Sequence, residues 1–306
     1  MFQYSLKKIL LLLLSLWAVI TLTFVLVHAI PGDPFTDEEA VPQEILASIH
    51  HYYGLDKPLI FQYKEYLLNL LQGDLGPSLK YQGRGANEII KESFPLSLAL
   101  GLEALCIAIS LGIPLGAISA LKRGKWHDSA IMCGAVLGIS LPSFILATLL
   151  QYFFAIQLDW FPIARSGSFL HTVLPALALA ALPTATIARL TRSSMVEVLE
   201  QDYILTARAK GLSQTQVIYR HALRNSLLPV IAYLGPLAAT VLTGSFVVEK
   251  IFGIPGLGQW FVLSVANRDY SLILSLTIFY SAFLMVATLV VDLISGWIDP
   301  RIKVVS

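Results

Sequence analysis

Charged residues are scarce in this sequence. Only 13% of its 306 positions are Asp, Glu, Lys or Arg, whereas 56% are hydrophobic. Soluble globular proteins are about one quarter charged. Together with a mean hydropathy of +0.71, this excludes an ordinary soluble domain and predicts a protein that lies mostly within a membrane.

Cysteine is equally scarce, with only Cys106 and Cys133 in the chain. Both fall inside long apolar stretches, where a structural disulfide framework is not expected. We therefore predict that both act as small apolar packing residues.

Signatures of catalysis are missing as well. The sequence has no Gly-x-x-x-x-Gly-Lys-Ser/Thr loop for ATP phosphates, no His-Glu-x-x-His zinc motif and no Gly-x-Ser-x-Gly nucleophile elbow. The six histidines are scattered, and the adjacent His50 and His51 would diverge on a helix, which favours a surface role over a metal site. We predict neither an enzyme nor a resident cofactor, so any ATP hydrolysis would take place on another chain.

Long apolar stretches, by contrast, are abundant. We predict six membrane spans, at residues 9–30, 96–121, 129–158, 170–190, 227–248 and 272–298. Each is long enough to cross the hydrocarbon core as a helix, which takes about 20 residues. None alternates in short segments as a membrane β-strand does. The predicted fold is an all-α integral membrane protein with six transmembrane helices.

The distribution of basic residues predicts the orientation of these spans. If the N-terminus is cytoplasmic, thirteen of the 21 Lys and Arg residues fall on cytoplasmic segments, and only Arg165, Lys250 and Arg268 lie in the two short outer loops. Lys and Arg are enriched on the cytoplasmic side of membrane proteins. We therefore expect both termini in the cytoplasm.

The segment 31–95 is the largest polar region outside the spans and is expected to be extracytoplasmic. We predict helices at residues 42–53 and 58–71 within it. The side chains expected near one face of the second helix are Phe61, Tyr66, Leu67 and Leu70. This loop could form a surface for an external partner, a lid on a transport path or a packed connector, and the sequence leaves the three open.

Small residues and prolines occur repeatedly within the spans. Gly112-x-x-x-Gly116 and Gly134-x-x-x-Gly138 have the spacing that lets helices approach closely in lipid. Prolines are expected to bend spans two to four. They are Pro114, Pro142, Pro175 and Pro183.

Two acidic residues, Glu103 and Asp292, fall within spans. An acid inside a membrane is a candidate for an ion or proton role because its burial without a partner is costly. Hydration near the outer interface offers Glu103 another explanation, and pairing with an arginine near the inner face offers Asp292 another.

A charged loop between the fourth and fifth spans, residues 191–226, is the most informative segment. Residues 194–210 lack Gly and Pro and are rich in helix formers, so we predict a helix there. Gly211 is placed as its C-cap, and Ser213 with Gln216 matches a capping box that starts a second helix to about residue 224. The mixture of acidic and basic residues suits a protein partner better than a lipid surface.

The motif Thr206-Ala-Arg-Ala-Lys-Gly211, followed after nine residues by His221-Ala-Leu-Arg and then Pro229, resembles the EAA loop of bacterial ABC-importer permeases. The general pattern is Glu-Ala-Ala, three residues, Gly, nine residues and Ile-x-Leu-Pro. Here Leu205 stands at the glutamate, Thr206 at the first alanine, His221 at the isoleucine and Arg224 at the proline. These departures are typical of the peptide-importing subfamily.

Further motifs extend the resemblance over nearly the whole chain. They are Gly54-Leu-Asp-x-Pro58, Gln62-Tyr63, Gly73-Asp-Leu-Gly76, Glu249-Lys-Ile-Phe-Gly-Ile-Pro-Gly-Leu-Gly258, Asn267-Arg-Asp-Tyr270 and Asp299-Pro-Arg301. The resemblance implies the type I ABC importer permease fold and the membrane subunit of an oligopeptide or dipeptide importer in the bacterial cytoplasmic (inner) membrane. The implied partners are a second homologous permease, two ATP-binding subunits and an extracytoplasmic peptide-binding protein.

The resemblance also assigns contact with the ATP-binding subunits to the charged loop. The expected contact residues are Leu205, Thr206, Ala207, Arg208, Ala209, Lys210, Gly211, Leu212, His221 and Pro229. The small Ala207, Ala209 and Gly211 would permit close approach, and Arg208 and Lys210 would provide charged contacts. The residues that bind the transported substrate are not assigned.

The expected organisation is a first span with an outer loop at 1–94, a transmembrane domain at 95–292, and the end of the last span with a tail at 293–306. The alternative function is a self-sufficient secondary transporter, which usually has coupling-ion groups at unwound helices near the membrane midplane. The lack of a clear pair of buried charges counts against it. The choice among dipeptides, oligopeptides, nickel chelates and glutathione as cargo stays open.

Overall fold

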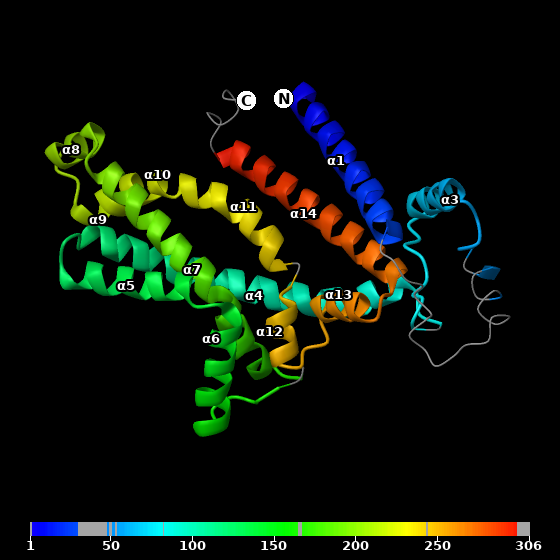
Figure 1. The fold of residues 1–306 in the computed structure, drawn as a ribbon. Helices are drawn as coiled ribbons and strands as arrows, with labels where there is room; N and C mark the ends of the chain where they lie inside the picture. Colours follow the sequence, from blue (N-terminus) through cyan, green and yellow to red (C-terminus); the bar gives the residue numbers. More distant parts are fainter. Residues whose placement is uncertain are drawn as a thin grey trace. The chain divides into compact units, whose positions relative to one another are not determined.

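The structure is a computed structural model in which residues 2–29, 48, 51–52, 54–81, 83–164, 167–242 and 244–298 are described, without the side chains of 2–8, 239 and 291–298. In these residues the elements are helices (Figure 1), apart from an isolated bridge between Pro77 and Gly85. The prediction of an all-α fold is confirmed. The predicted helix at 42–53 lies largely outside the described residues.

The helices fall into three groups along the chain. The first contains α1 (Phe2–Ala29), α3 (Leu59–Leu71) and α4 (Ala86–Leu121). The second contains α5 (Trp126–Ser140), α6 (Ser143–Leu150), the π-helix η1 (Gln151–Gln157) and α7 (Leu170–Leu199). The third contains α8 (Asp202–Ala209), α9 (Gln214–Gln216), the π-helix η2 (Val217–Leu223), α10 (Arg224–Ser226), α11 (Leu228–Leu242), α12 (Phe246–Ile251), α13 (Leu257–Ala266) and α14 (Tyr270–Ile298).

Five helical stretches of the described chain are long and apolar enough to cross a membrane. They are Ile9–Ala29, Ala86–Leu121, Leu170–Leu199, Leu228–Ile251 and Tyr270–Val290. The bent pair formed by α5 with α6 and η1 is a sixth candidate if the pair counts as one span. Counted in this way, the candidates agree with the six predicted spans. The cytoplasmic placement of both termini stays a prediction.

The third predicted span, residues 129–158, is not one straight helix. It breaks between Ser140 and Ser143, and its two halves differ in direction by 106°. Leu141 has φ −82° and ψ 121°, because the residue before a proline is excluded from the helical region. The other three prolines did not end their spans, since α4 continues past Pro114 and α7 past Pro175 and Pro183.

The fifth predicted span, residues 227–248, is also interrupted. Helix α11 ends at Leu242 and α12 starts at Phe246. The buried side chain of Glu249 accepts a hydrogen bond of 2.7 Å from the hydroxyl of Ser97 in α4. Within a membrane, backbone and side-chain polar groups at such a break need partners inside the protein. The Ser97–Glu249 bond therefore attaches the interrupted segment to α4.

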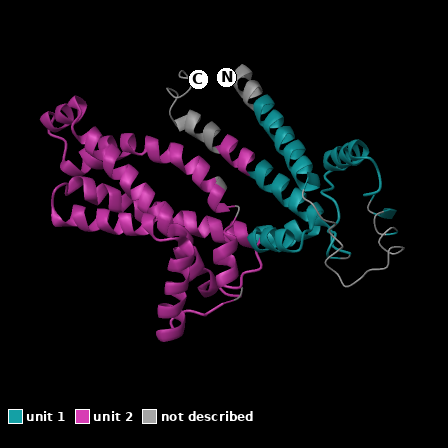
Figure 2. Cartoon of the chain, in the orientation of Figure 1, with its two compact units in different colours: residues 1–95, 257–283 teal, residues 96–256, 284–306 magenta. Residues whose placement is uncertain are grey.

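The chain forms two compact units (Figure 2). Unit 1 comprises residues 1–95 and 257–283, and unit 2 comprises residues 96–256 and 284–306. Helices α4 and α14 each contribute residues to both units. The boundaries that the sequence suggested at residues 94 and 292 stay a prediction.

In unit 1, the buried carboxylate of Asp269 organises the start of α14. It accepts hydrogen bonds of 3.1 Å from the backbone N–H groups of Leu79 and Leu272, and one from the Ser78 hydroxyl. The amide of Asn267 donates to the Tyr81 hydroxyl at 3.0 Å. The motif that begins at Asn267 therefore ties the segment 78–81 to the first turn of α14.

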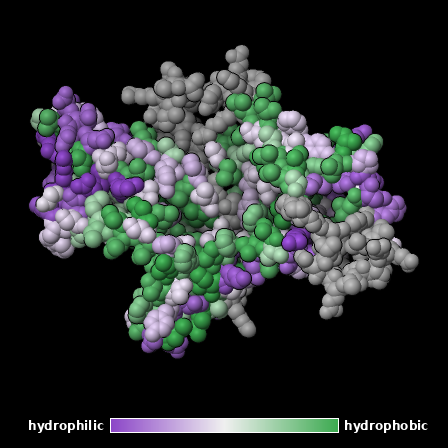
Figure 3. Space-filling view, viewed as in Figure 1, coloured by the Kyte–Doolittle hydropathy of each residue, from purple (hydrophilic) through white to green (hydrophobic). Residues whose placement is uncertain are grey.

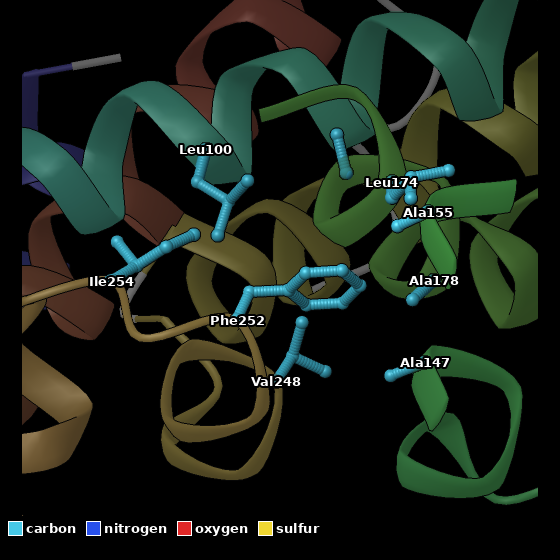
Figure 4. Packing of buried hydrophobic residues seen from close by; sticks show 9 residues of the cluster. Leu100, Ala147, Ala155, Leu174, Ala178, Val248, Phe252 and Ile254 are labelled. Atoms are coloured by element: carbon cyan, nitrogen blue, oxygen red, sulfur yellow. The ribbon is translucent and has the colours of Figure 1, made fainter. Parts of the chain in front are cut away.

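In unit 2, apolar residues of α4, α6, η1, α7 and α12 share one core. The Phe252 ring, 1% exposed, lies among the side chains of this cluster (Figure 4). The cluster consists of Leu100, Ala147, Ala155, Leu174, Ala176, Ala178, Val248, Phe252 and Ile254. It holds the short segments that follow the two helix breaks against the long helices α4 and α7.

The first small-residue motif packs α4 against α7, as its spacing predicted. A Cβ atom on Gly116 would lie 2.4 Å from the carbonyl oxygen of Ala188, and one on Gly112 would lie 2.8 Å from Ile187 Cγ2. The second motif is used in part: Gly138 approaches Ala185, whereas a Cβ on Gly134 would meet nothing within 4 Å.

The contacts of Gly116 yield a stability prediction. Gly116→Ala should lower the melting temperature, because the added methyl meets backbone atoms and overpacking costs about 1–3 kcal/mol. Gly134→Ala is the matched control and should leave the melting temperature unchanged or raise it, since Ala favours the helix by about 1 kcal/mol. Thermal unfolding of both purified variants in detergent measures the difference. Equal effects would contradict the close α4–α7 contact.

Candidate functional site

The charged loop after α7 contains a break that the sequence did not reveal. We predicted one helix at 194–210, but α7 ends at Leu199 and α8 begins at Asp202. Met195 and Ile204 are both fully buried in one cluster. Nine residues apart, they would point to opposite sides of a straight helix at 100° per residue. The break lets both side chains enter the same core, so the prediction of a single helix was wrong.

The turn after α8 has the predicted chemistry. Gly211 has φ +78°, the left-handed conformation that a residue with a side chain rarely adopts. The capping box is confirmed: the Gln216 N–H donates to Ser213 Oγ at 3.3 Å, and the Ser213 N–H donates to Gln216 Oε1 at 3.1 Å. Both ends of the turn are therefore fixed by local hydrogen bonds.

The second helix of the loop extends to Ser226, but its middle is a π-helix, η2, which was not predicted. Val217 and Ala222 are both buried in the same cluster. Five residues correspond to about 140° in an α-helix but to little more than one full turn of a π-helix, which has i→i+5 hydrogen bonds. The π-helix therefore brings both side chains to one face.

The inner side of the loop is an apolar cluster, which we call the loop core. It consists of Ala120 from α4, Met195 from α7, Ile204 and Ala207 from α8, and Val217 and Ala222 from η2. Ala207 is only 6% exposed, so its small side chain fits against the chain itself. The loop is thus packed onto the ends of two long helices.

The outer side of the loop carries most of the residues expected at a partner contact. We call this the loop surface; its exposed members are Leu205, Thr206, Arg208, Ala209, Lys210, Gly211, Leu212 and Pro229. The side chain of Leu205 is 56% exposed although it is apolar. His221 is partly buried in η2. The structure brings residues 205–212 together, while Pro229 lies in the first turn of α11.

A buried ion pair lies next to the loop core. Asp128, 5% exposed at the start of α5, accepts two hydrogen bonds from Arg192 of α7, to Oδ1 at 2.6 Å and Oδ2 at 2.8 Å. The Ser119 hydroxyl donates to Oδ1 at 2.5 Å, and the Gly124 N–H donates to Oδ2 at 3.0 Å. Four donors on three elements therefore converge on one carboxylate.

An exposed ion pair joins the same elements farther out. Arg123, in the turn between α4 and α5, donates to Glu200 at the end of α7 at 2.7 Å. Figure 3 shows hydrophilic side chains gathered at the end of unit 2 that carries α8, while hydrophobic side chains cover α6. The polar end of the unit therefore holds the loop surface and both ion pairs.

The sequence did not point to the Asp128–Arg192 pair, because its members are 64 residues apart. Of the two acids within spans, Glu103 is partly buried in α4, and the Asp292 side chain lies outside the described residues. Among the side chains that the structure describes, no three His, Cys, Asp or Glu residues come together as a metal site.

Comparison with known proteins identifies relatives along the whole chain. The family described as "Binding-protein-dependent transport system inner membrane component" matches residues 112–304, and its N-terminal counterpart matches residues 1–100. The dipeptide transport system permease protein DppB of Bacillus subtilis is 51% identical over 99% of this chain and 98% of its own. The oligopeptide transport system permease protein OppB of Salmonella typhimurium is 43% identical over 99% and 100%.

Among solved structures, the chain resembles one from the inward-facing conformations of the MetNI methionine ABC transporter. The TM-score is 0.56 with 15% sequence identity, over 69% of this chain and 96% of that chain. At this identity the likeness shows a common fold.

The buried ion pair yields a stability prediction. Asp128→Asn and Arg192→Ala should each lower stability markedly, because removing one member of a buried pair costs about 3–5 kcal/mol. Arg123→Ala is the matched control: its pair is exposed, and such pairs contribute about 0–1 kcal/mol. Melting temperatures of the purified variants test this. If Arg192→Ala were no more harmful than Arg123→Ala, the buried pair would not hold these helices.

Proposed function

This chain belongs to the family of binding-protein-dependent transport system inner membrane components, and from that premise we propose that it is the permease subunit of an ATP-driven peptide importer. Its cargo is a dipeptide or an oligopeptide that crosses the bacterial cytoplasmic membrane. The observation that carries this proposal is the full-length similarity to a dipeptide permease at 51% identity. The similarity to oligopeptide permeases, at 43%, supports the same class of cargo.

The proposed partners are a second homologous permease, two ATP-binding subunits and an extracytoplasmic peptide-binding protein. ATP hydrolysis takes place on the ATP-binding subunits, in keeping with a sequence that has no phosphate-binding loop. Selection among peptides falls mainly to the separate binding protein. This chain supplies the path across the membrane and the contact that makes the path respond to ATP.

The loop surface is the proposed contact with an ATP-binding subunit. It offers the exposed apolar side chain of Leu205 beside the positive charges of Arg208 and Lys210. An apolar anchor surrounded by charged groups is the usual composition of a specific protein interface. Gly211, with open space around its Cα, leaves room for a partner to approach the turn closely.

Movement of the ATP-binding subunits reaches the membrane through the inner side of the same loop. The loop core joins α8 and η2 to α4 and α7, and the Asp128–Arg192 pair joins α7 to α5. Packed cores transmit rigid-body displacement because they are hardly compressible. A shift of the loop surface therefore displaces three transmembrane helices together and changes which side of the membrane the path opens to.

Cysteine crosslinking tests the proposed contact. In a Cys106→Ser, Cys133→Ser background, Ala209→Cys should crosslink to an ATP-binding subunit expressed from the same operon, with a yield that changes when ATP is added. Ala207→Cys is the control, because its side chain faces the loop core and should give little product. Absence of any crosslink, with Ala209→Cys freely labelled from the cytoplasm in the assembled complex, would contradict the contact.

Reconstitution separates an importer subunit from a self-sufficient carrier. The purified chain alone in liposomes should take up no peptide under a proton or sodium gradient. Liposomes that also contain the second permease, the ATP-binding subunits and the peptide-binding protein should accumulate peptide when ATP is supplied. Gradient-driven uptake by this chain alone would refute the proposed function and favour the carrier.

A further inference from the structure

Helix α3 leaves a large apolar face without a partner in the described structure. Ile60 is 70% exposed, Phe61 59%, Leu68 49% and Leu71 85%. At 100° per residue these four side chains lie within about 100° of one another. Phe61 was predicted to share a face with Tyr66, but it lies on the exposed side instead.

The opposite face of α3 packs on the last three turns of α1, within unit 1. The Tyr63 hydroxyl lies 2.6 Å from Thr21 Oγ1, and the Gln62 amide oxygen lies 3.3 Å from His28 Nε2. The rings of Tyr63 and Tyr66 lie 5.2 and 6.1 Å from the ring of Phe24. Figure 1 shows α3 beside the end of α1.

These contacts place α3 at the depth of a membrane interface. The candidate span of α1 runs from Ile9 to Ala29. Thr21 precedes the end of this span by eight residues, about 12 Å along a helix that rises 1.5 Å per residue. A side chain of α3 that reaches Thr21 therefore brings its helix to the level of the lipid headgroups and upper acyl chains.

We propose that the exposed face of α3 lies in the extracytoplasmic leaflet of the membrane, so that the segment after α1 is an interfacial anchor. The ligand of this surface is phospholipid: acyl chains cover Ile60, Phe61, Leu68 and Leu71, and an anionic headgroup meets the ammonium of Lys64. The proposal follows from the predicted orientation of α1 and does not depend on the identity of the cargo.

Two observations favour lipid over water or a protein partner. The apolar face of α3 continues the surface of α1, where Leu22, Val25 and Leu26 are 61%, 56% and 56% exposed in a span that must meet lipid. Lys64 falls between Ile60 and Leu68 on the same face and is exposed. A lysine can extend its charge to the headgroups while its methylene groups stay among apolar chains, as on helices that lie on membranes.

Spin-label accessibility in the assembled transporter tests this proposal. In a Cys106→Ser, Cys133→Ser background, single cysteines replace Ile60, Leu68 or Leu71, and Glu65→Cys is the control on the polar side of α3. The labelled complexes are placed in nanodiscs of phosphatidylethanolamine and phosphatidylglycerol. Collision rates with oxygen, which concentrates in lipid, are compared with those of a water-soluble nickel chelate.

The ratio of oxygen to nickel collision rates should exceed one at positions 60, 68 and 71 and fall below one at position 65. Ratios below one at all four positions would place the helix in water and overturn the proposal. Low collision rates for both reagents that rise when the peptide-binding protein or the second permease is omitted would assign the face to that protein instead. Peptide uptake by each labelled complex, measured in parallel, reports on the transport function separately.

Discussion

The carboxylate of Asp128 is the group on which the architecture of unit 2 most depends. An anion with almost no contact with solvent is tolerated only when charge and hydrogen bonds compensate for its lost hydration. Here Arg192 neutralises it, and Ser119 and the Gly124 N–H satisfy its remaining lone pairs. Because these donors belong to α4, the α4–α5 turn and α7, the compensation also fixes the relative positions of those helices. The charged loop is attached to the same elements.

The two helix breaks pose the opposite problem, that of backbone polar groups exposed within a membrane. Pro142 starts the second half of one span, and the fifth span is interrupted before α12. Such breaks persist in membrane proteins only where other protein groups or a water-filled path meet them. The core around Phe252 and the bond between Ser97 and Glu249 provide this support in unit 2. The same breaks are where a permease can bend without unfolding a complete helix.

Local chemistry could be read from the sequence where it needs only neighbouring residues. Apolar length predicted the spans, Gly211 predicted a left-handed turn, and Ser213 with Gln216 predicted the capping box. Features set by tertiary contacts could not be read in this way. The break before Asp202 exists because Met195 and a residue nine positions later enter one core, and the Asp128–Arg192 pair joins residues 64 positions apart. The 106° bend at Pro142 likewise depends on how α6 packs on α7.

The central claim is that the loop moves together with α4, α5 and α7 when the transporter responds to ATP. The most direct measurement is the distance between spin labels at Ala209, on the loop surface, and Lys125, in the turn between α4 and α5, by pulsed electron paramagnetic resonance. The assembled transporter would be compared with and without ATP. We predict that this distance distribution stays unchanged while the transporter changes conformation. A shift on ATP binding would show that the loop moves independently of these helices and would contradict the claim.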